Sequence, residues 1–200
     1  MKLKRKFYAR PTLVVARDLL GKVLVRCYQG KLIKGRIIET EAYIGKDDPA
    51  CHACSGMTER NKPMFGEAGH AYIYFTYGMH YCFNVVTEKE GFGSAVLIRA
   101  VEPLEGIDFI KKRRDGAKSA KAPLGRRRID DKNLANGPAK LCQAFVLDKK
   151  LNGEDLLGNR LWVEDDGFWD RKLATAEAVV KKSPRVGIKE GLDKHWRFYL

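Results

Sequence analysis

AYIYFTYGMHYCFNVVT, residues 71–87, is the stretch that most clearly indicates the fold class. Aromatic and β-branched side chains dominate its two halves, 71–76 and 80–87, and residues of these types favour strands. Gly78 lies between the halves, where the chain has to turn. The stretch therefore predicts a β-hairpin or a bent pair of strands.

The segments on either side of this pair also have the composition of strands. The dipeptide Gln29-Gly30 separates two of them, which predicts a second strand pair. The further strands that we expect are 23–28, 32–43, 94–101, 160–164, 185–188 and 196–200. Because strands follow one another without a regular alternation with helices, the sequence predicts an α+β fold with a largely antiparallel sheet.

Helices and loops are expected in the remaining segments. Proline in a first helical turn and glycine just beyond a last turn mark helix boundaries. These signals predict helices over 11–20, 103–114 and 138–147. Residues 45–70 are rich in glycine, proline and polar side chains, which indicates a long loop that is either functional or disordered. Residues 117–132 carry many basic and few apolar side chains, so we expect a basic, mobile loop there.

The charge balance points to a polyanionic partner. The chain of 200 residues suits one compact domain, which we expect to span residues 1–200. It contains 38 lysines and arginines against 25 aspartates and glutamates, which gives a formal net charge of +13. Such a balance favours nucleic acid or an anionic membrane face as partner. No apolar stretch approaches the length of a membrane span, so we expect neither secretion nor membrane insertion.

The five cysteines form no dense framework, and their odd number predicts reduced thiols and an intracellular protein. Cys51 and Cys54, with His52 between them and His80 or Cys82 downstream, are candidate zinc ligands. A zinc nucleobase deaminase needs a His-x-Glu motif before its Pro-Cys-x-x-Cys motif, and no histidine precedes His52. A single Cys-x-x-Cys motif favours free thiols, so we expect no metal. The glycine spacing also lacks a phosphate-loop or dinucleotide motif, so we expect no cofactor.

One strand carries the residues that favour acid–base chemistry. Glu39, Glu41 and Tyr43 fall on the same face of the strand 36–43, because strand side chains alternate. Such a face is most often solvated, and the alternative is one wall of a polar pocket. A carboxylate in a pocket can act as a general base that activates water. The spacing does not distinguish Glu39 from Glu41 in this role.

The aromatic strand pair allows two interpretations. Tyr72 and Tyr74 share a strand face, and aromatic strands usually belong to a core. The functional alternative is a surface that stacks on bases, with a side chain at the turn that wedges into DNA. Tyr77, beside Gly78, is well placed for such a wedge.

Taken together, many ordered stretches of this chain resemble the alkyladenine (3-methyladenine) DNA glycosylase family. The resemblance runs from about Phe7 to Tyr199 and rests on residues 16–21 (ARDLLG), 39–43 (ETEAY), 52–65, 72–79, 82–84, 97–103 (LIRAVEP) and 137–144 (GPAKLCQA). Any one stretch is weak, whereas the ordered set is highly specific. It implies one α+β domain with a curved, largely antiparallel sheet, peripheral helices and a protruding β-hairpin.

The resemblance also implies roles for individual residues, and it selects the second glutamate of the ETEAY strand as the general base. These roles are catalysis by Glu41 and Arg99, binding of a flipped base by Tyr43, His52, Tyr74 and Asn84, intercalation into DNA by Tyr77, and weaker phosphate contacts by Arg60 and Lys140. Cys51 and Cys54 receive no role from it.

The implied activity is that of a monofunctional DNA glycosylase that initiates base excision repair. Its substrate would be double-stranded DNA that contains 3-methyladenine, 7-methylguanine, hypoxanthine or ethenoadenine. No lysine is identified as a Schiff-base nucleophile, so we expect an abasic product without strand cleavage. We expect an intracellular monomer without metal or organic cofactor, located in the cytoplasm or nucleoid if the source is a bacterium. The alternatives are a non-catalytic nucleic-acid-binding module and a zinc-dependent deaminase.

Overall fold

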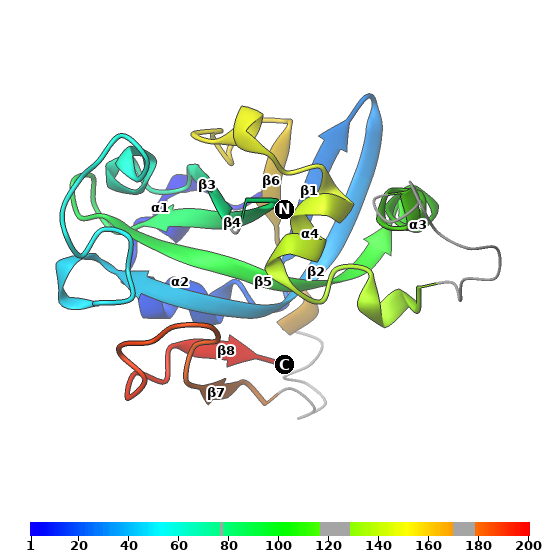
Figure 1. Ribbon diagram of the computed structural model, residues 1–200. Coiled ribbons are helices and arrows are strands. Elements are labelled where there is room, and N and C mark those ends of the chain that lie inside the picture. The colour runs from blue at the N-terminus through cyan, green and yellow to red at the C-terminus, as the bar shows by residue number, and fades with distance from the viewer. Residues whose placement is uncertain (77, 117–128, 170–178) are drawn as a thin grey trace.

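The computed structural model describes residues 1–76, 78–116, 129–169 and 179–200. The predictions for Tyr77 and for the basic segment 117–128 fall outside these residues. Within the described part, an antiparallel sheet with strand order β3-β4-β5-β2-β1-β6 forms the body of the molecule, and β8 pairs with both β2 and β7. Figure 1 shows this sheet curling along its length. The predicted α+β class and the curved antiparallel sheet are confirmed.

The strands lie close to where the sequence predicts them. Their bounds are β1 (Val23–Tyr28), β2 (Lys31–Ile44), β3 (Ala71–Thr76), β4 (His80–Thr87), β5 (Ser94–Glu105), β6 (Leu161–Glu164), β7 (Lys181–Ser183) and β8 (Arg197–Tyr199). β3 and β4 pair as a hairpin from Ala71↔Val85 to Thr76↔His80. Of the two arrangements that the sequence left open for residues 71–87, the hairpin is therefore the correct one.

The helices are short and lie around the sheet (Figure 1). Their bounds are α1 (Arg5–Tyr8), α2 (Thr12–Asp18), α3 (Ile107–Gly116) and α4 (Pro138–Phe145), with 3-10 turns η1 (Gly45–Asp47), η2 (Lys62–Phe65), η4 (Asp131–Asn133) and η5 (Lys149–Leu151). α2 packs on β2 and β5, whereas α4 packs on β4 and β5. The long loop predicted over 45–70 is confirmed, with η1 and η2 as its only regular turns among the described residues. No described helix is both long and apolar enough to cross a membrane.

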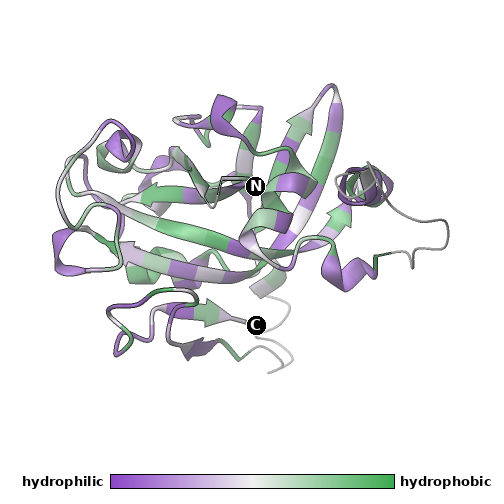
Figure 2. Cartoon of the chain, viewed as in Figure 1, coloured by the Kyte–Doolittle hydropathy of each residue, from purple (hydrophilic) through white to green (hydrophobic). Residues whose placement is uncertain are grey.

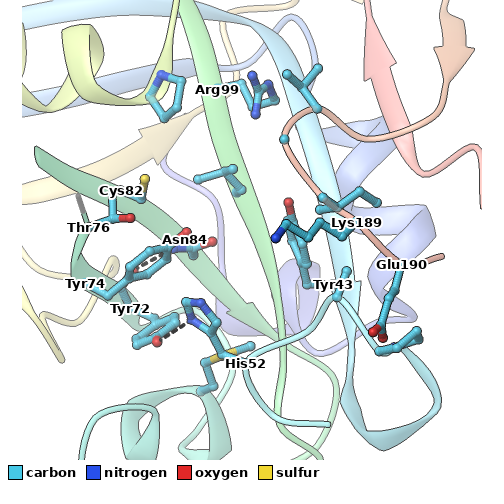
Figure 3. A pocket seen from close by; sticks show the side chains of 18 residues that line it. Tyr43, His52, Tyr72, Tyr74, Thr76, Cys82, Asn84, Arg99, Lys189 and Glu190 are labelled. Atoms are coloured by element: carbon cyan, nitrogen blue, oxygen red, sulfur yellow. Dashed lines mark hydrogen bonds between the residues drawn. The ribbon is translucent and has the colours of Figure 1, made fainter. Parts of the chain in front are cut away.

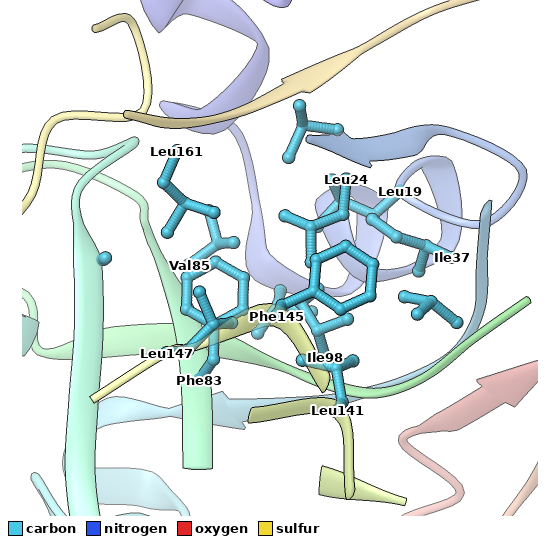
Figure 4. Close-up of a cluster of buried hydrophobic side chains, with 14 of the residues drawn as sticks. Leu19, Leu24, Ile37, Phe83, Val85, Ile98, Leu141, Phe145, Leu147 and Leu161 are labelled. Atoms are coloured by element: carbon cyan, nitrogen blue, oxygen red, sulfur yellow. The ribbon is translucent and has the colours of Figure 1, made fainter. Parts of the chain in front are cut away.

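The main core lies where α4 meets the sheet. Phe145, Ile98 and Leu24 are fully buried there (Figure 4). Gly35 on β2 allows the close packing, since a Cβ at this position would lie 2.9 Å from the Phe145 ring. Figure 2 shows β5 as mostly hydrophobic and α3 as mostly hydrophilic, as expected for a central strand and a peripheral helix.

A second, smaller cluster joins the long loop to the hairpin. Its buried members are Cys51, Ala53, Met64, Tyr72, Val86 and Ala95, and Tyr43, Phe65 and Tyr74 pack against them. This cluster fixes the loop against the aromatic face of β3 and β4.

Two predicted elements are wrong. Residues 103–105 continue β5 instead of starting a helix, and α3 begins only at Ile107. Pro103 is tolerated in the strand because it lies beside a register irregularity at Gly35. Residues 185–188 form no strand. β8 pairs instead with β7, which lies at residues 181–183. The Arg185 side chain instead turns inward to Asp48, which takes residues 185–188 away from the sheet ladder.

Candidate active site

A cavity of about 450 Å³ opens where β2, β3, β4 and β5 meet the long loop and the segment 186–190 (Figure 3). Such a volume is typical of a site for a small organic group. We call one side the sheet wall, which consists of Tyr43, Tyr72, Tyr74, Thr76, Cys82, Asn84, Leu97 and Arg99. We call the other side the loop wall, which consists of Pro49, Ala50, His52, Met64 and residues 186–190. Pro138, at the start of α4, completes the lining.

The Glu41 carboxylate is fully buried directly behind the cavity lining. One oxygen, Oε1, accepts a hydrogen bond from the Val186 amide at 2.7 Å. The other, Oε2, accepts from the Tyr43 hydroxyl at 2.9 Å and from Arg99 Nη1 at 3.1 Å. All three donors belong to residues that line the cavity. A carboxylate has about four acceptor positions, so one remains beyond these three bonds.

A register irregularity in the sheet aims Arg99 at the two glutamates. The pairing of β2 with β5 passes from Glu39↔Ala100 to Thr40↔Ile98 and leaves Arg99 without a register partner. The Arg99 guanidinium then bridges Glu39, with Nε at 2.9 Å from Oε1, and Glu41. Burial alone would lower the pKa of Arg99, but the Glu41 and Glu39 carboxylates raise it, so the guanidinium stays charged.

The two glutamates that the spacing left equivalent have different surroundings. Glu39 Oε1 accepts from Arg99 and, at 2.6 Å, from Arg197 Nε on β8. Neither glutamate lines the cavity itself, and none of the cavity-lining tyrosines of the described chain bonds to Glu39. The Glu41 carboxylate accepts hydrogen bonds from Tyr43, Arg99 and Val186, and of these three only Arg99 also bonds to Glu39. The prediction that Glu39, Glu41 and Tyr43 share one strand face is consistent with these contacts, and the face around Glu41 is buried instead of solvated.

Three aromatic rings, that of His52 from the loop wall and those of Tyr72 and Tyr74 from the sheet wall, lie against one another at one end of the cavity (Figure 3). The rings of His52 and Tyr74 lie edge to face, with centroids 4.5 Å apart, and Tyr72 lies 5.4 Å from Tyr74. His52 Nδ1 is 2.9 Å from the Tyr72 hydroxyl, and Figure 3 shows this contact. Burial raises the pKa of Tyr72 to about 12 and raises that of Tyr74 further, so both hydroxyls remain protonated.

His52 is kept neutral by its surroundings. Desolvation by the atoms around the ring lowers its pKa, and the positive charge of Arg60 lowers it further. The Arg60 guanidinium lies over the Tyr74 ring at 5.7 Å and donates to the Phe75 carbonyl at 3.1 Å. Arg60 therefore stands at the outer side of the hairpin, next to the aromatic cluster.

The long loop is closed by side-chain to backbone hydrogen bonds. Buried Asn61 donates from Nδ2 to the His52 carbonyl at 2.7 Å and to the Gly56 carbonyl at 2.9 Å. Its Oδ1 accepts from the Thr58 amide at 2.6 Å. These bonds replace a regular ladder and place His52 opposite Tyr72 and Tyr74.

The remaining predicted residues lie nearby or fall outside the described chain. Asn84 lines the cavity and donates from Nδ2 to the Tyr72 carbonyl at 3.0 Å. Lys140 is on α4 and donates to Asn136 Oδ1 at 2.7 Å. The structure thus brings Tyr43, His52, Tyr74, Asn84 and Arg99 together around one cavity. The intercalating role of Tyr77 stays a prediction.

The cysteines near the cavity do not form a metal site with their neighbours. Burial raises the pKa of Cys51 to about 11, and its Sγ donates to the Gly93 carbonyl at 3.8 Å. The Cys54 Sγ lies 3.6 Å from Ser55 Oγ, and the His52 ring bonds to Tyr72. Among the described residues there is no group of three or more His, Cys, Asp or Glu that is arranged to hold a metal ion.

Sequence reasoning missed several residues of the site. Val186, Lys189 and Glu190 line the cavity, and of these only Val186 lies in the predicted strand 185–188. Asp48 and Arg185 form a fully buried ion pair below it. Of these residues, only Asp48 carries a local sequence signal, because it precedes a proline in a polar loop. Its side chain forms an Asx turn with the Ala50 amide.

Comparison with known proteins finds a matching family model and relatives that cover nearly the whole chain. The family model of methylpurine-DNA glycosylase (MPG) matches residues 6–200. A protein of Carboxydothermus hydrogenoformans is 52% identical over 200 residues, which cover 100% of this chain and 95% of that protein. A protein of Chlorobaculum parvum is 46% identical over 200 residues, with coverage of 100% and 87%. A protein of Methanocella arvoryzae is 46% identical over 201 residues, with coverage of 98% and 91%.

All three relatives bear the name "Putative 3-methyladenine DNA glycosylase". The family model covers nearly the whole chain, and the identities extend over the full length of the described sheet and cavity. The chain therefore belongs to the methylpurine-DNA glycosylase family and is a DNA glycosylase, a hydrolase of N-glycosidic bonds.

Proposed function

We propose that this protein flips a damaged purine out of duplex DNA into the cavity and hydrolyses the bond between base and sugar. The observation that carries this proposal is the Glu41 carboxylate, held by three cavity-lining donors immediately beside an aromatic cavity. A base can reach a buried site only after it leaves the stack, which costs a few kcal/mol. The aromatic lining offsets this cost, because stacking contributes about 1–3 kcal/mol per base.

The substrates that we propose are 3-methyladenine, 7-methylguanine, hypoxanthine and ethenoadenine in double-stranded DNA. Tyr43 would stack on one face of the flipped base, and His52 and Tyr74 on the other. Asn84 is tied to the Tyr72 carbonyl through Nδ2, which turns its amide oxygen to the other side. In that place the side chain would disfavour guanine by crowding its exocyclic amine.

The reaction needs a group that stabilises positive charge on the sugar as the base departs. Breaking the C1′–N9 bond gives the sugar oxocarbenium character, and a nearby carboxylate stabilises such a cation. Glu41 would also take a proton from the attacking water, whose oxygen then bonds to C1′. Tyr43, Arg99 and Val186 orient the carboxylate for both tasks. The bases 3-methyladenine and 7-methylguanine carry positive charge in DNA and leave readily, whereas neutral hypoxanthine and ethenoadenine require protonation as they leave.

The protein would bind DNA as a single domain of residues 1–200 and as a monomer, inside the cell. Tyr77 would fill the gap left by the flipped nucleotide. The net charge of +13 favours the DNA backbone, and Arg60 and Lys140 are candidate phosphate contacts. Water is the only nucleophile in this proposal, so the product is an abasic site in an uncut strand and the start of base excision repair. No metal or organic cofactor takes part.

Base release from a panel of duplexes, each with one lesion, tests this proposal. Glu41→Gln keeps the size of the side chain but not its basicity, so hypoxanthine release in a single turnover should fall by about 10³-fold. Glu39→Gln, on the same strand face, is the matched control and should cause a much smaller loss. Release of hypoxanthine by Glu41→Gln at the wild-type rate would contradict the mechanism. A modified base that remains attached to DNA would indicate a deaminase.

A further inference from the structure

A fully buried ion pair lies beneath the loop wall of the cavity. Arg185 Nη1 is 2.5 Å from Asp48 Oδ2 and Nη2 is 2.7 Å from Oδ1, and both side chains have no solvent exposure. Arg185 Nη1 also donates to the carbonyl of Ala42, the residue between Glu41 and Tyr43, at 2.9 Å. The pair therefore reaches the backbone of the strand that carries the proposed general base.

The pair connects both segments of the loop wall. On one side, Asp48 accepts hydrogen bonds from the Ile44 and Ala50 amides, each at 3.2 Å, and so shapes the turn that follows β2. On the other side, Arg185 directly precedes Val186, whose amide donates to Glu41. The two segments are 137 positions apart in sequence and share this contact.

The same guanidinium also supports a base-stacking ring. It lies 4.7 Å from the centroid of Tyr43 and 5.1 Å from that of Trp196. Tyr43 is thus packed between the cavity and a fixed cation, and its hydroxyl bonds to Glu41. Arg185 therefore contacts the stacking ring of Tyr43 and directly precedes Val186. Tyr43 and Val186 are two of the three donors to Glu41.

Stability alone does not require an ion pair at this place. Burying two charges costs desolvation, and apolar side chains of similar volume often stabilise such a contact equally well. An apolar pair lacks the directional hydrogen bonds that fix the orientation of a side chain. The planar guanidinium presents its donors in a fixed fork, which two carboxylate oxygens and one carbonyl oxygen hold in a single orientation here.

We propose that Asp48 and Arg185 are positioning residues for base excision. They hold the Val186 amide on Glu41 and the Tyr43 ring at the cavity, and so set the geometry in which the carboxylate meets water and sugar. This inference rests on the proposed function, in which Glu41 is the general base. Neither side chain lines the cavity, so both act through Tyr43, Val186 and Glu41.

The decisive variant is the double substitution Asp48→Leu with Arg185→Met, which replaces the pair by apolar side chains of similar volume. It should melt within a few degrees of wild type and bind a duplex with an abasic-site analogue with similar affinity. Its single-turnover release of hypoxanthine at saturating enzyme should fall by about 100-fold, the typical consequence of a misplacement of about 1 Å. A double variant that is both stable and fully active would overturn the proposal.

Arg185→Lys provides a second route if the double variant does not fold. Lysine keeps the charge but cannot engage both Asp48 oxygens and the Ala42 carbonyl, so the same loss of rate is expected. A wild-type rate in this variant would count against positioning. Asp155→Asn is the matched control, because it breaks the ion pair with Arg5 far from the cavity, and its base release should stay at the wild-type rate.

Amide hydrogen exchange at Val186 separates this proposal from the proposed function. The amide should be protected in the wild-type protein by its bond to Glu41 and should exchange much faster in Arg185→Lys. Unchanged protection would refute positioning even if the enzyme excises bases. If the wild-type protein releases no base, the proposed function fails, and the exchange measurement still decides whether the pair orients Val186 on Glu41.

Discussion

The sheet wall and the loop wall of the cavity are held in place in different ways. Most residues of the sheet wall sit in antiparallel register, with Tyr72 opposite Asn84 and Tyr74 opposite Cys82, and Arg99 lies at a register irregularity. The loop wall has no such ladder, and buried side chains, chiefly Asn61 and the Asp48–Arg185 pair, fix its backbone. The sheet wall therefore depends on many equivalent bonds, whereas the loop wall depends on a few individual side chains.

This difference predicts that the largest structural effect comes from a residue that supports the loop wall without lining the cavity. Asn61→Ala removes the partners of the His52 and Gly56 carbonyls and of the Thr58 amide. A buried polar group without a partner costs about 1–3 kcal/mol, so we expect unfolding free energy to fall by at least about 2 kcal/mol. Denaturant unfolding measures this loss.

The matched control for Asn61→Ala is Asn61→Asp. It retains an acceptor for the Thr58 amide but sets a buried carboxylate oxygen against the two carbonyl oxygens, so it should be no more stable than the alanine variant. An alanine variant as stable as the wild type would mean that the loop wall does not depend on this side chain.

A substitution in the sheet wall should act on binding and leave the wall in place. Tyr74→Ala removes one stacking ring, which contributes about 1–3 kcal/mol per base, so affinity for DNA with a flipped ethenoadenine should fall by about 10- to 100-fold. Titration with such a duplex measures it, and amide exchange in β3 and β4 should stay close to wild type. Loss of protection throughout the hairpin would show that the sheet wall also depends on single side chains.

The smallest effect concerns the electrostatic influence of Arg60 on His52, two residues of the long loop. His52 of the loop wall has its pKa lowered below the ordinary value of 6.5 by desolvation and, secondarily, by Arg60. Arg60→Gln should therefore raise the His52 pKa, though not to 6.5, because desolvation remains. Titration of the His52 ring protons by NMR measures the shift. Lys62→Gln removes a charge from the same loop and should leave the His52 pKa unchanged.

The sign of the linked stability follows from the direction of the shift. The folded protein holds His52 neutral more strongly than the unfolded chain does, so this contribution is complete above pH 6.5 and is lost as the pH falls through the folded-state pKa. Because Arg60→Gln narrows the interval between the two pKa values, it should make stability less sensitive to acid in this window. Greater acid sensitivity in the variant would contradict this interpretation.

The sequence predicts best the parts of the fold that follow from neighbouring residues, such as the alternation of side chains along a strand. Alternation along residues 36–43 places Glu39, Glu41 and Tyr43 together, and the aromatic runs on both sides of Gly78 predict the hairpin of β3 and β4. The same local rules fail at Pro103, where a helix-start signal lies inside β5, because register with β2 outweighs local preference. They also fail at residues 185–188, because the inward turn of Arg185 to Asp48 depends on a distant residue.

The sequence by itself determined the α+β class, the strand that carries the candidate carboxylates and, through the ordered family resemblance, the choice of Glu41. Only the tertiary structure decided that Glu41 is enclosed by Tyr43, Arg99 and Val186 while Glu39 binds Arg99 and Arg197. It alone also revealed that residues 186–190 belong to the loop wall. The physical reason is that strand alternation is set by neighbouring residues, whereas a buried ion pair such as Asp48–Arg185 forms only when the folded sheet brings two distant segments together.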